Sequence, residues 1–410
     1  MNHLCLCTAC LFGFALLGIA HGHEAGVEAV SELAPAAEPA SGRFAFIKGD
    51  DWATGSDISL GGIFFPSMHL SAALGTSSGE PEALAAGHHD PNRKGITVQN
   101  VEFEMRMRAG KHVEGFIAYA AVLDQDDHWQ GSVEEAFGRV KDLPGGFELR
   151  GGRYYNRFGF YNTLHPHSYQ FVNRDLLEAR MLGEDAVTTE GAEVVWNIPG
   201  NTQCSGSLSL SYGRVFLEVE EEKEEGAGPL FSPEGALFSD WLFSADARVS
   251  YRHNDFHQWT GLASFMTGDN AYGRNTAAVA VGLEYLWSEN GYEKGGRSFR
   301  WRTEVIHRQA GAVSTAEAGE PILRRSLHES GISTAGLYGF NEKFHAGMGI
   351  AFVEGIGAAG LSERWRLSPM VQWNLAKNVN LLLQYDHDRI RDFGSEDSIW
   401  LQANISWGGH

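Results

Sequence analysis

Apolar and polar residues alternate along most of the chain, most clearly near its C-terminal end. Between residues 397 and 407, Ile399, Leu401 and Ile405 share one face, and Ser398 lies on the other. Successive side chains of a strand point to opposite faces, so this pattern predicts strands with one apolar and one polar side. Sixteen such segments lie near residues 57–75, 96–109, 113–123, 131–140, 147–156, 187–198, 205–219, 240–252, 255–267, 275–288, 298–309, 333–341, 344–354, 363–375, 379–387 and 397–407.

Two architectures fit such alternating strands. A soluble sandwich or barrel hides the apolar face inside, whereas a transmembrane barrel turns it outward to lipid. The lengths of the connections favour the second, because short ones (AGKH, KDLPGG, PGNTQC, HN, EK, AKN) alternate with long ones. The long connections are 76–95, 157–186, 220–239, 310–332 and 388–396. We therefore predict an all-β fold, a transmembrane antiparallel β-barrel of about sixteen strands, with short periplasmic turns and long external loops.

Aromatic residues agree with a lipid-facing exterior. Trp365 and Trp373 share the apolar face of one segment, eight positions apart, which would place them near the two interfaces of a bilayer. The apolar faces of other segments carry further candidates for these aromatic belts, namely Tyr285, Trp287, Tyr385 and Trp407. The alternative interpretation is that these rings belong to the core of a soluble protein.

The N-terminal residues have the pattern of an export signal, as an outer-membrane barrel requires. Residues 5–20 form an uninterrupted apolar run that is too short to cross a membrane, and small residues near Gly22 suit cleavage. We expect three parts: residues 1–22 as a signal peptide, 23–56 as a flexible periplasmic segment and 57–407 as the barrel. After cleavage, Cys204 would be the one cysteine left, which excludes an internal disulfide and a cysteine-based metal site.

Composition narrows the function further. The chain has 52 acidic residues against 32 Lys and Arg, a formal net charge of −20, which argues against nucleic acid as a partner. It contains no P-loop and no HExxH zinc-protease motif, so no enzyme is expected. An adhesin or purely structural barrel remains an alternative, as does a soluble periplasmic β-protein.

The polar faces of several segments would line the lumen. They carry more arginine than carboxylate, which suggests a preference for anions in a channel. The expected lining residues are Glu102, Glu104, Arg106, Arg108, Asp246, Arg248, Arg252, Arg300, Arg302, Glu304, Arg308, Arg364 and Arg366.

The connection 157–186 is the candidate constriction. It contains aromatic residues, mixed charge and a possible helical turn at 175–181, and it joins the fifth and sixth segments on the external side. By analogy with general porins, in which the equivalent loop folds inward, we expect it to narrow the lumen. Arg157, His165, His167 and Arg174 are the residues expected to form the constriction.

A family resemblance is strongest in residues 134–199, EEAFGRVKDLPGGFELRGGRYYNRFGFYNTLHPHSYQFVNRDLLEARMLGEDAVTTEGAEVVWNIP, and covers most of the chain after residue 22 more loosely through the rhythm of its strands. The chain resembles bacterial outer-membrane barrels described as zinc-regulated TonB-dependent receptors, which look related to the phosphate-selective porins. The resemblance implies a barrel of about sixteen strands in the outer membrane of a diderm bacterium, and traffic of solutes or metal ions. Receptors of the TonB type carry a large plug domain, for which residues 23–56 leave no room.

We therefore predict a porin-like channel for passive diffusion of small hydrophilic solutes, with outer-membrane lipid as its surroundings. The alternative is a receptor or channel for zinc or another metal ion, based on loop histidines. Its candidate ligands are His88, His89, His165 and His167, because neutral imidazole is a common zinc ligand. No other cofactor is expected. Porins are often trimers, so a homo-oligomer is compatible with this prediction, although no residue pattern marks a subunit interface.

Overall fold

A computed structural model of the chain describes residues 59–124, 128–216, 231–232, 234–293, 295–314 and 323–408. The signal peptide and the flexible segment expected at 1–22 and 23–56 lie outside these residues.

The described residues form sixteen strands, as the alternating pattern predicted. In chain order they are β1 Phe64–Ser77, β2 Gly95–Ala109, β3 Val113–Leu123, β4 Trp129–Leu143, β5 Phe147–Tyr155, β6 Thr188–Ile198, β7 Cys204–Phe216, β8 Phe238–Asn254, β9 His257–Asn270, β10 Asn275–Ser288, β11 Ser298–Val313, β12 Arg324–Gly339, β13 Phe344–Val353, β14 Arg364–Ala376, β15 Val379–Ile390 and β16 Gly394–Gly408. The helical elements are α2 Pro81–Leu84 and α3 Leu176–Leu182, with 3₁₀ turns η1 Pro166–Ser168, η2 Glu234–Ala236 and η3 Gly357–Ala359.

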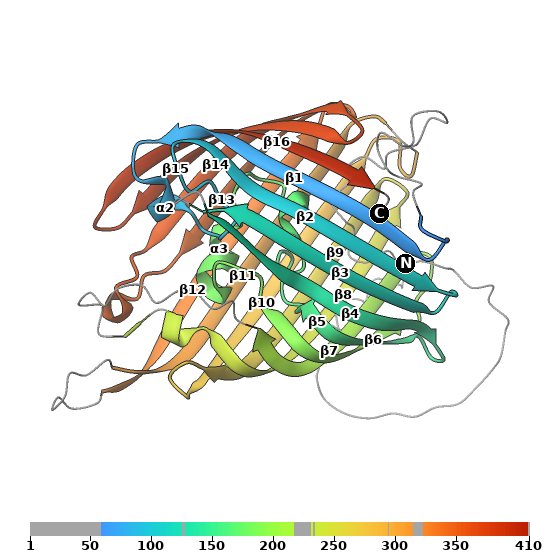
Figure 1. Cartoon of the computed structure of the whole chain (residues 1–410), viewed down its shortest axis with the longest axis horizontal. Coiled ribbons are helices and arrows are strands. Elements are labelled where there is room, and N and C mark those ends of the chain that lie inside the picture. The colour runs from blue at the N-terminus through green and yellow to red at the C-terminus, as the bar shows by residue number, and fades with distance from the viewer. Residues whose placement is uncertain are drawn as a thin grey trace, which may run out of the picture. The chain divides into compact units, whose positions relative to one another are not determined.

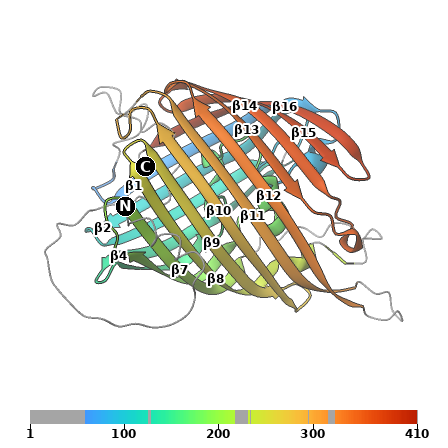
Figure 2. The same cartoon turned by 180° about the vertical axis from the view of Figure 1, so that it is seen from behind.

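The strands close into one antiparallel barrel (Figures 1 and 2). Each strand pairs with its neighbours in sequence, and β1 also pairs with β16 through partners such as Met68 and Trp407. Closure leaves no strand edge unpaired, which is what a sheet needs in a solvent without hydrogen-bonding groups.

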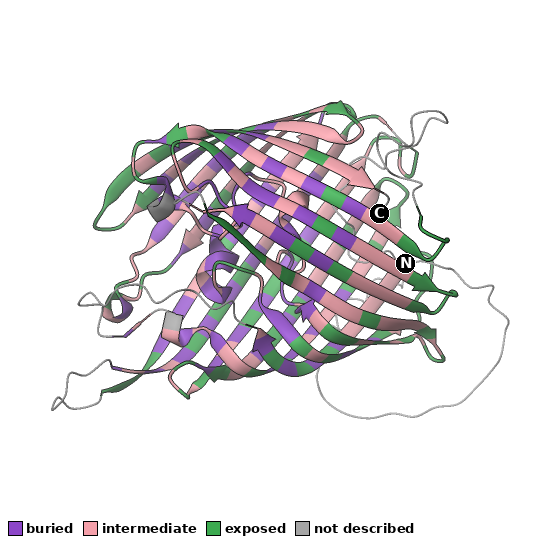
Figure 3. Cartoon of the chain, viewed as in Figure 1, coloured by how far each residue is buried: buried purple, intermediate pink, exposed green. Residues whose placement is uncertain are grey.

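The two faces of each strand differ in the way that a membrane barrel requires. Along β10, Ala280 and Glu284 are buried on the inner side, whereas Val279 and Val281 are exposed on the outer side. The same alternation crosses the other strands as stripes of buried and exposed residues (Figure 3). An exterior of exposed Val, Leu, Ile, Phe and Trp around a closed barrel is a lipid-facing surface. Among the described residues, no helix is both long and apolar enough to cross a membrane.

Aromatic rings gather on this outer face. Trp373 stacks on Phe344 with ring centroids 5.7 Å apart, and Trp259 lies 4.5 Å from Tyr285 across neighbouring strands. Cross-strand ring pairs of this kind stabilise adjacent strands and suit the borders of a bilayer.

The strand bounds differ from expectation mainly on the external side. There, β12 begins at Arg324 and not at residue 333, whereas at the opposite, short-turn end β1 begins at Phe64 and not at residue 57. The connection expected at 388–396 shrinks to three residues, because β15 continues to Ile390 and β16 starts at Gly394. The strands extend beyond the clearest alternation because each added residue gains a ladder hydrogen bond with its neighbour.

Candidate functional site: a loop inside the barrel

The connection between β5 and β6, residues 156–187, folds into the interior of the barrel (Figure 1). Its two structured parts reach different walls, since η1 contacts β1 while α3 contacts β11, β12 and β13. The loop therefore crosses the lumen, as expected for residues 157–186.

Asparagine side chains fix the base of the loop. The Asn162 amide donates to the carbonyl oxygens of Asn156 (2.8 Å) and Val187 (3.1 Å) and accepts from the Val187 N–H (2.8 Å). These bonds satisfy main-chain groups at the point where the β5–β6 ladder ends, and the Asn156 N–H also donates to the Val187 carbonyl at 2.9 Å. The two ends of the loop are thereby held together before it enters the lumen.

Gly159 brings the loop main chain directly against the wall. Its N–H donates to the Ser264 hydroxyl at 3.1 Å, its carbonyl accepts from Arg248 at 2.7 Å, and the next N–H, of Phe160, donates to Glu304 at 3.0 Å. Its φ is +63°, and a Cβ there would lie 2.4 Å from a Glu304 oxygen. Only glycine meets both the conformation and the close approach.

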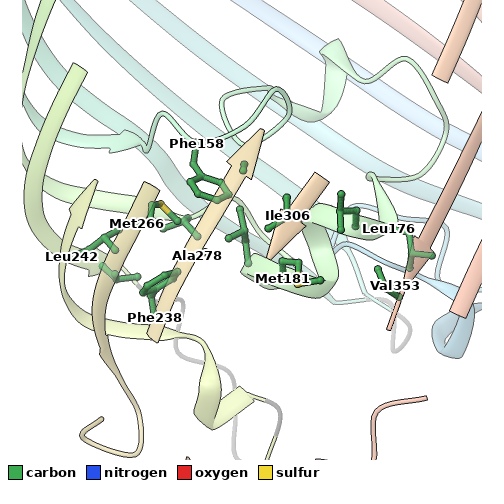
Figure 4. Packing of buried hydrophobic residues seen from close by; sticks show 14 of the residues in the cluster. Phe158, Leu176, Met181, Phe238, Leu242, Met266, Ala278, Ile306 and Val353 are labelled. Carbon is green, nitrogen blue, oxygen red and sulfur yellow. The ribbon is translucent and has the colours of Figure 1, made fainter. Parts of the chain in front are cut away.

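The α3 part of the loop is held by apolar packing. Met181 is fully buried in one cluster with Ile306 of β11 and Val353 of β13 (Figure 4). Leu177 is also fully buried and belongs to the same cluster. Each fully buried side chain of this size contributes about 1.5–3 kcal/mol. The inner wall is apolar where α3 lies on it, and the rest of this cluster is Phe158, Leu176, Leu182, Val187, Val215, Phe238, Leu242, Met266, Ala278, Ala280 and Ala351.

Charged groups surround this apolar contact. Arg180 of α3 lies 2.6 Å from Glu329 of β12, and Arg308 of β11 contacts both Glu329 (2.8 Å) and the Met181 carbonyl (3.0 Å). Asp175 caps α3 by accepting from the Leu177 N–H at 3.0 Å, and it also accepts from the Ser333 hydroxyl of β12. The helix is thus fixed to the wall at both ends.

The η1 part of the loop meets carboxylates instead. One ring nitrogen of His165, Nδ1, lies 2.6 Å from Glu102 and 3.1 Å from Glu134, and Nε2 lies 2.9 Å from Glu135. Burial alone would lower the pKa of His165, but the charge of Glu102 and hydrogen bonds to the three carboxylates raise it well above its usual value. A ring with carboxylates at both nitrogens is held as imidazolium.

His167 lies beside this group. Its Nδ1 is 2.7 Å from Glu102, and its ring stacks on that of His69 of β1 with centroids 3.8 Å apart. The His69 Nε2 faces Glu104 at 3.8 Å. Two histidines and two glutamates from the loop, β1 and β2 therefore meet inside the barrel.

The other two residues expected in the constriction also contact the interior. Arg157 lies 3.2 Å from Glu193 of β6. The Arg174 main-chain N–H donates to Asp90 at 2.7 Å, and its guanidinium donates to the Glu184 carbonyl at 2.8 Å. Every cation that the sequence analysis placed in this loop is matched by an acceptor.

The structure places the thirteen expected lining residues on inward-facing positions, but six of the arginines form ion pairs, with four carboxylates among them. Arg302 lies 2.7 Å from Glu284, and Arg366 lies 3.0 Å from Asp388. The other paired arginines are Arg248 with Asp246, Arg300 with Glu284, Arg308 with Glu329, and Arg364 with Asp388. Among the buried side chains of the described residues, carboxylates outnumber guanidinium groups, because they include carboxylates that the sequence analysis did not assign, such as Glu284, Glu329 and Asp388.

The four histidines proposed as metal ligands do not converge as a set in the described residues. His89 lies 3.4 Å from Glu134, and its Nδ1 faces the Gln99 carbonyl at 2.9 Å. His88 packs edge-on to His89 and joins neither of the two groups with ligand-like spacing. Those groups are His69, Glu104 and His167, and Glu102, Glu104 and His165.

A β-bulge explains why Glu134 and Glu135 escaped the sequence analysis. The β3–β4 register shifts between Ala118, which pairs with Glu135, and Tyr119, which pairs with Val133. The bulge leaves Glu134 without a direct partner, and both glutamates turn toward His165. Strict alternation would have sent one of them to lipid. His69 was identifiable, because it occupies the polar face of the first alternating segment.

Two short glycine patterns resemble enzyme motifs but lack the necessary context. Residues 75–79 read GTSSG, yet they lie at the end of β1 and the Ser77 hydroxyl donates to the Gly79 carbonyl at 2.6 Å. Residues 355–360 read GIGAAG, in the connection between two antiparallel strands. A nucleophile elbow or a dinucleotide site would need a strand–turn–helix unit.

Comparisons with known proteins agree with the barrel. No family model matches the chain. An uncharacterized protein of Aquifex aeolicus is 31% identical over 114 residues, covering 26% of this chain and 24% of that relative. The chain thus spans about a quarter of the curated relative that it matches.

Solved structures show the same fold at low sequence identity. The outer membrane channel DcaP of Acinetobacter baumannii has a TM-score of 0.51 at 10% identity, over 86% of this chain and all of that one. The anion-selective porin from Comamonas acidovorans has a TM-score of 0.50 at 9% identity, over 84% and 98%. Salmonella typhi OmpF, in a complex with daunomycin, has a TM-score of 0.50 at 11% identity, over 84% and 97%.

The fold is therefore the sixteen-stranded barrel of outer-membrane porins. Its lipid-facing exterior and closed topology place the chain in a bacterial outer membrane. These likenesses support the porin part of the family resemblance and do not show a TonB-dependent zinc receptor.

Proposed function

We propose that this protein is a channel through which small hydrophilic solutes diffuse passively, and not an enzyme. The observation that carries the proposal is the β5–β6 loop, which is packed from base to tip against the inner wall of a porin barrel. A loop held in this way narrows the lumen. Its charged and polar surroundings favour hydrated solutes over apolar ones.

Swelling of liposomes tests this proposal. Vesicles containing the purified full chain should swell in isotonic solutions of small neutral sugars, more slowly as the sugar becomes larger. Vesicles without protein provide the baseline. Equal rates with and without folded protein would contradict passive diffusion.

An anion preference is a finer part of the proposal. Within the described residues, Arg106, Arg108 and Arg252 form no ion pair, and all three lie near the short-turn ends of β2 and β8. Arg108 lies over the Phe65 ring and Arg252 over the Tyr292 ring, which leaves their charges uncompensated by carboxylate. Positive charge at one end of a lumen favours anions there. Reversal potentials in a salt gradient measure this preference.

Traffic of zinc or another divalent metal ion is the second candidate. The group formed by His69, Glu104 and His167 favours it, because it offers nitrogen and oxygen ligands inside the lumen. Flux of radioactive zinc into liposomes, compared with sugar uptake by the same preparation, separates metal transport from general diffusion. Zinc uptake no faster than that of a sugar of similar hydrated size would contradict it.

A further inference from the structure

The η1 part of the loop meets the barrel wall at a compact group of potential metal ligands. His69 comes from β1, Glu104 from β2 and His167 from η1. Their ligand atoms all lie within 4.8 Å of one another, and the His69 side chain is 1% exposed. Three segments far apart in the sequence thus bring two imidazoles and a carboxylate to one point.

Neighbouring groups hold these side chains in place. The Ser406 hydroxyl lies 3.0 Å from Nδ1 of His69, so Nε2 is the nitrogen directed toward Glu104. The Ser67 hydroxyl donates to Glu104 at 2.9 Å. Hydrogen bonds to the far side of a ligand fix its orientation and are typical of metal centres.

The charge of the surroundings favours a cation. Glu102 and Glu104 of β2 share this part of the wall, and Glu134 and Glu135 approach His165 from β4. A second group with ligand-like spacing, Glu102, Glu104 and His165, shares Glu104 with the first. Buried carboxylates in this number need compensating positive charge, which protons on the imidazoles or a divalent ion can supply.

We propose that His69, Glu104 and His167 form a binding site for one divalent transition-metal ion, for which Zn²⁺ is the best chemical match. Zinc takes imidazole nitrogen and carboxylate oxygen, and three protein ligands leave a fourth position for water. Mg²⁺ and Ca²⁺ prefer sites made of oxygen alone, so two imidazoles select against them. The His69 and His167 rings stack nearly parallel, 12° apart, so both imidazoles lie side by side at this point.

Binding would join the loop to the wall. His167 belongs to the loop, whereas His69 and Glu104 belong to adjacent strands, so one ion would connect three segments. The metal in this inference is a resident of the site and need not be transported. The inference therefore does not depend on the proposed channel function, and a barrel that fails to conduct could still bind zinc here.

Isothermal titration calorimetry of the detergent-solubilised full chain with ZnCl₂ tests the site. The expected result is one Zn²⁺ per chain, with no binding of Mg²⁺ or Ca²⁺ at the same concentrations. His69→Ala, Glu104→Gln and His167→Ala should each lower zinc affinity at least about tenfold. His112→Ala, in the exposed turn between β2 and β3, is the matched control and should leave the affinity unchanged.

A folding check and a spectroscopic measurement accompany the zinc titration. His167 lies outside the strands, so His167→Ala should fold even if a wall variant does not, and heat-modifiable migration on SDS gels checks barrel formation. X-ray absorption at the zinc edge should show nitrogen and oxygen ligands with two imidazoles. Absence of zinc binding, unchanged affinity in folded His167→Ala, or a sulfur ligand, which would point to Cys204, would each overturn the proposal.

Discussion

The two structured parts of the inner loop are attached to the barrel by different forces. At the α3 end, Leu177 and Met181 are buried against Ile306 and Val353 in a cluster without titratable side chains. At the η1 end, His165 forms ion pairs with three carboxylates, beside ring contacts with Tyr155 and Phe116. Apolar packing depends little on pH or metal ions, whereas ionic contacts depend on both. We therefore expect the apolar contact of α3 with the wall to persist when pH or metal ions change, and the contact of η1 with the wall to depend on both.

The largest effect is expected from placing a charge in the apolar end. Leu177→Asp would bury an unpaired carboxylate where no cation is within the cluster, at a cost above about 4 kcal/mol. We expect α3 to leave the wall, so that trypsin cleaves after Arg174 and Arg180, which the native contacts protect. Leu177→Met, which conserves volume, is the matched control and should stay resistant. Equal resistance of both variants would mean that apolar packing does not hold this end.

A somewhat smaller effect is expected at the ionic end. Glu102→Gln removes the charge that lies 2.6 Å from His165 and 2.7 Å from His167, which should cost about 3 kcal/mol of local stability. Hydrogen exchange of residues 164–170 should rise while that of α3 stays low. Glu190→Gln, in an exposed pair with Arg153, serves as the control. If hydrogen exchange of α3 rose together with that of residues 164–170, the two ends would act as one unit, which would contradict the prediction.

The ionic end should also respond to alkaline pH. Burial lowers the pKa of His89, but its hydrogen bond and charge interaction with Glu134, helped by Asp185, raise it to about 9. Because the folded-state pKa exceeds the unfolded value of about 6.5, this stabilisation is complete below that value and is lost as pH rises through about 9.

Loss of the His89 contact can be measured by trypsin cleavage after Arg93 and Lys94, which are close to His89 in the sequence. Cleavage should increase between about pH 8 and about pH 10 in the native protein, and His89→Gln should already be cleaved at neutral pH. Cleavage after Arg180 at the apolar end should not change over the same range. Identical pH profiles for native protein and His89→Gln would contradict this assignment.

The smallest effect is expected at arginines that lie away from both attachments. The double variant Arg106→Ala, Arg108→Ala removes two charges that no carboxylate neutralises among the described residues. Anion selectivity should fall by a few-fold with the inner loop unaffected, as measured by reversal potential. Replacing Arg364 and Arg366, which already share Asp388, should change selectivity less. A larger change in selectivity on replacing Arg364 and Arg366 than on replacing Arg106 and Arg108 would contradict this prediction.

Much of the barrel was predictable because its period-two pattern is local. The outward positions of Trp365 and Trp373, and the inward positions of Arg300 and Arg302, follow from alternation alone. The inward course of residues 157–186 was expected by analogy, and the structure places all four of its expected constriction residues in contact with the interior.

The interior chemistry was less predictable because it depends on long-range contacts. The apolar cluster that includes α3 extends to Leu242 of β8 and Met266 of β9, and apolar residues on these inward positions look in the sequence like an error in the alternation. The pairing of arginines with Glu284, Glu329 and Asp388 depends on which strands become neighbours. A sum of charges over the polar faces could not reveal these pairs.

Single-channel recording in a planar bilayer tests the central claim most directly, which is that the lumen conducts and the inner loop limits it. The purified full chain should open stable current steps, and Leu177→Asp should give larger and noisier steps, because α3 no longer stays on the wall. Folded native protein that opens no steps, or a variant with the same conductance despite a trypsin-sensitive loop, would contradict the account.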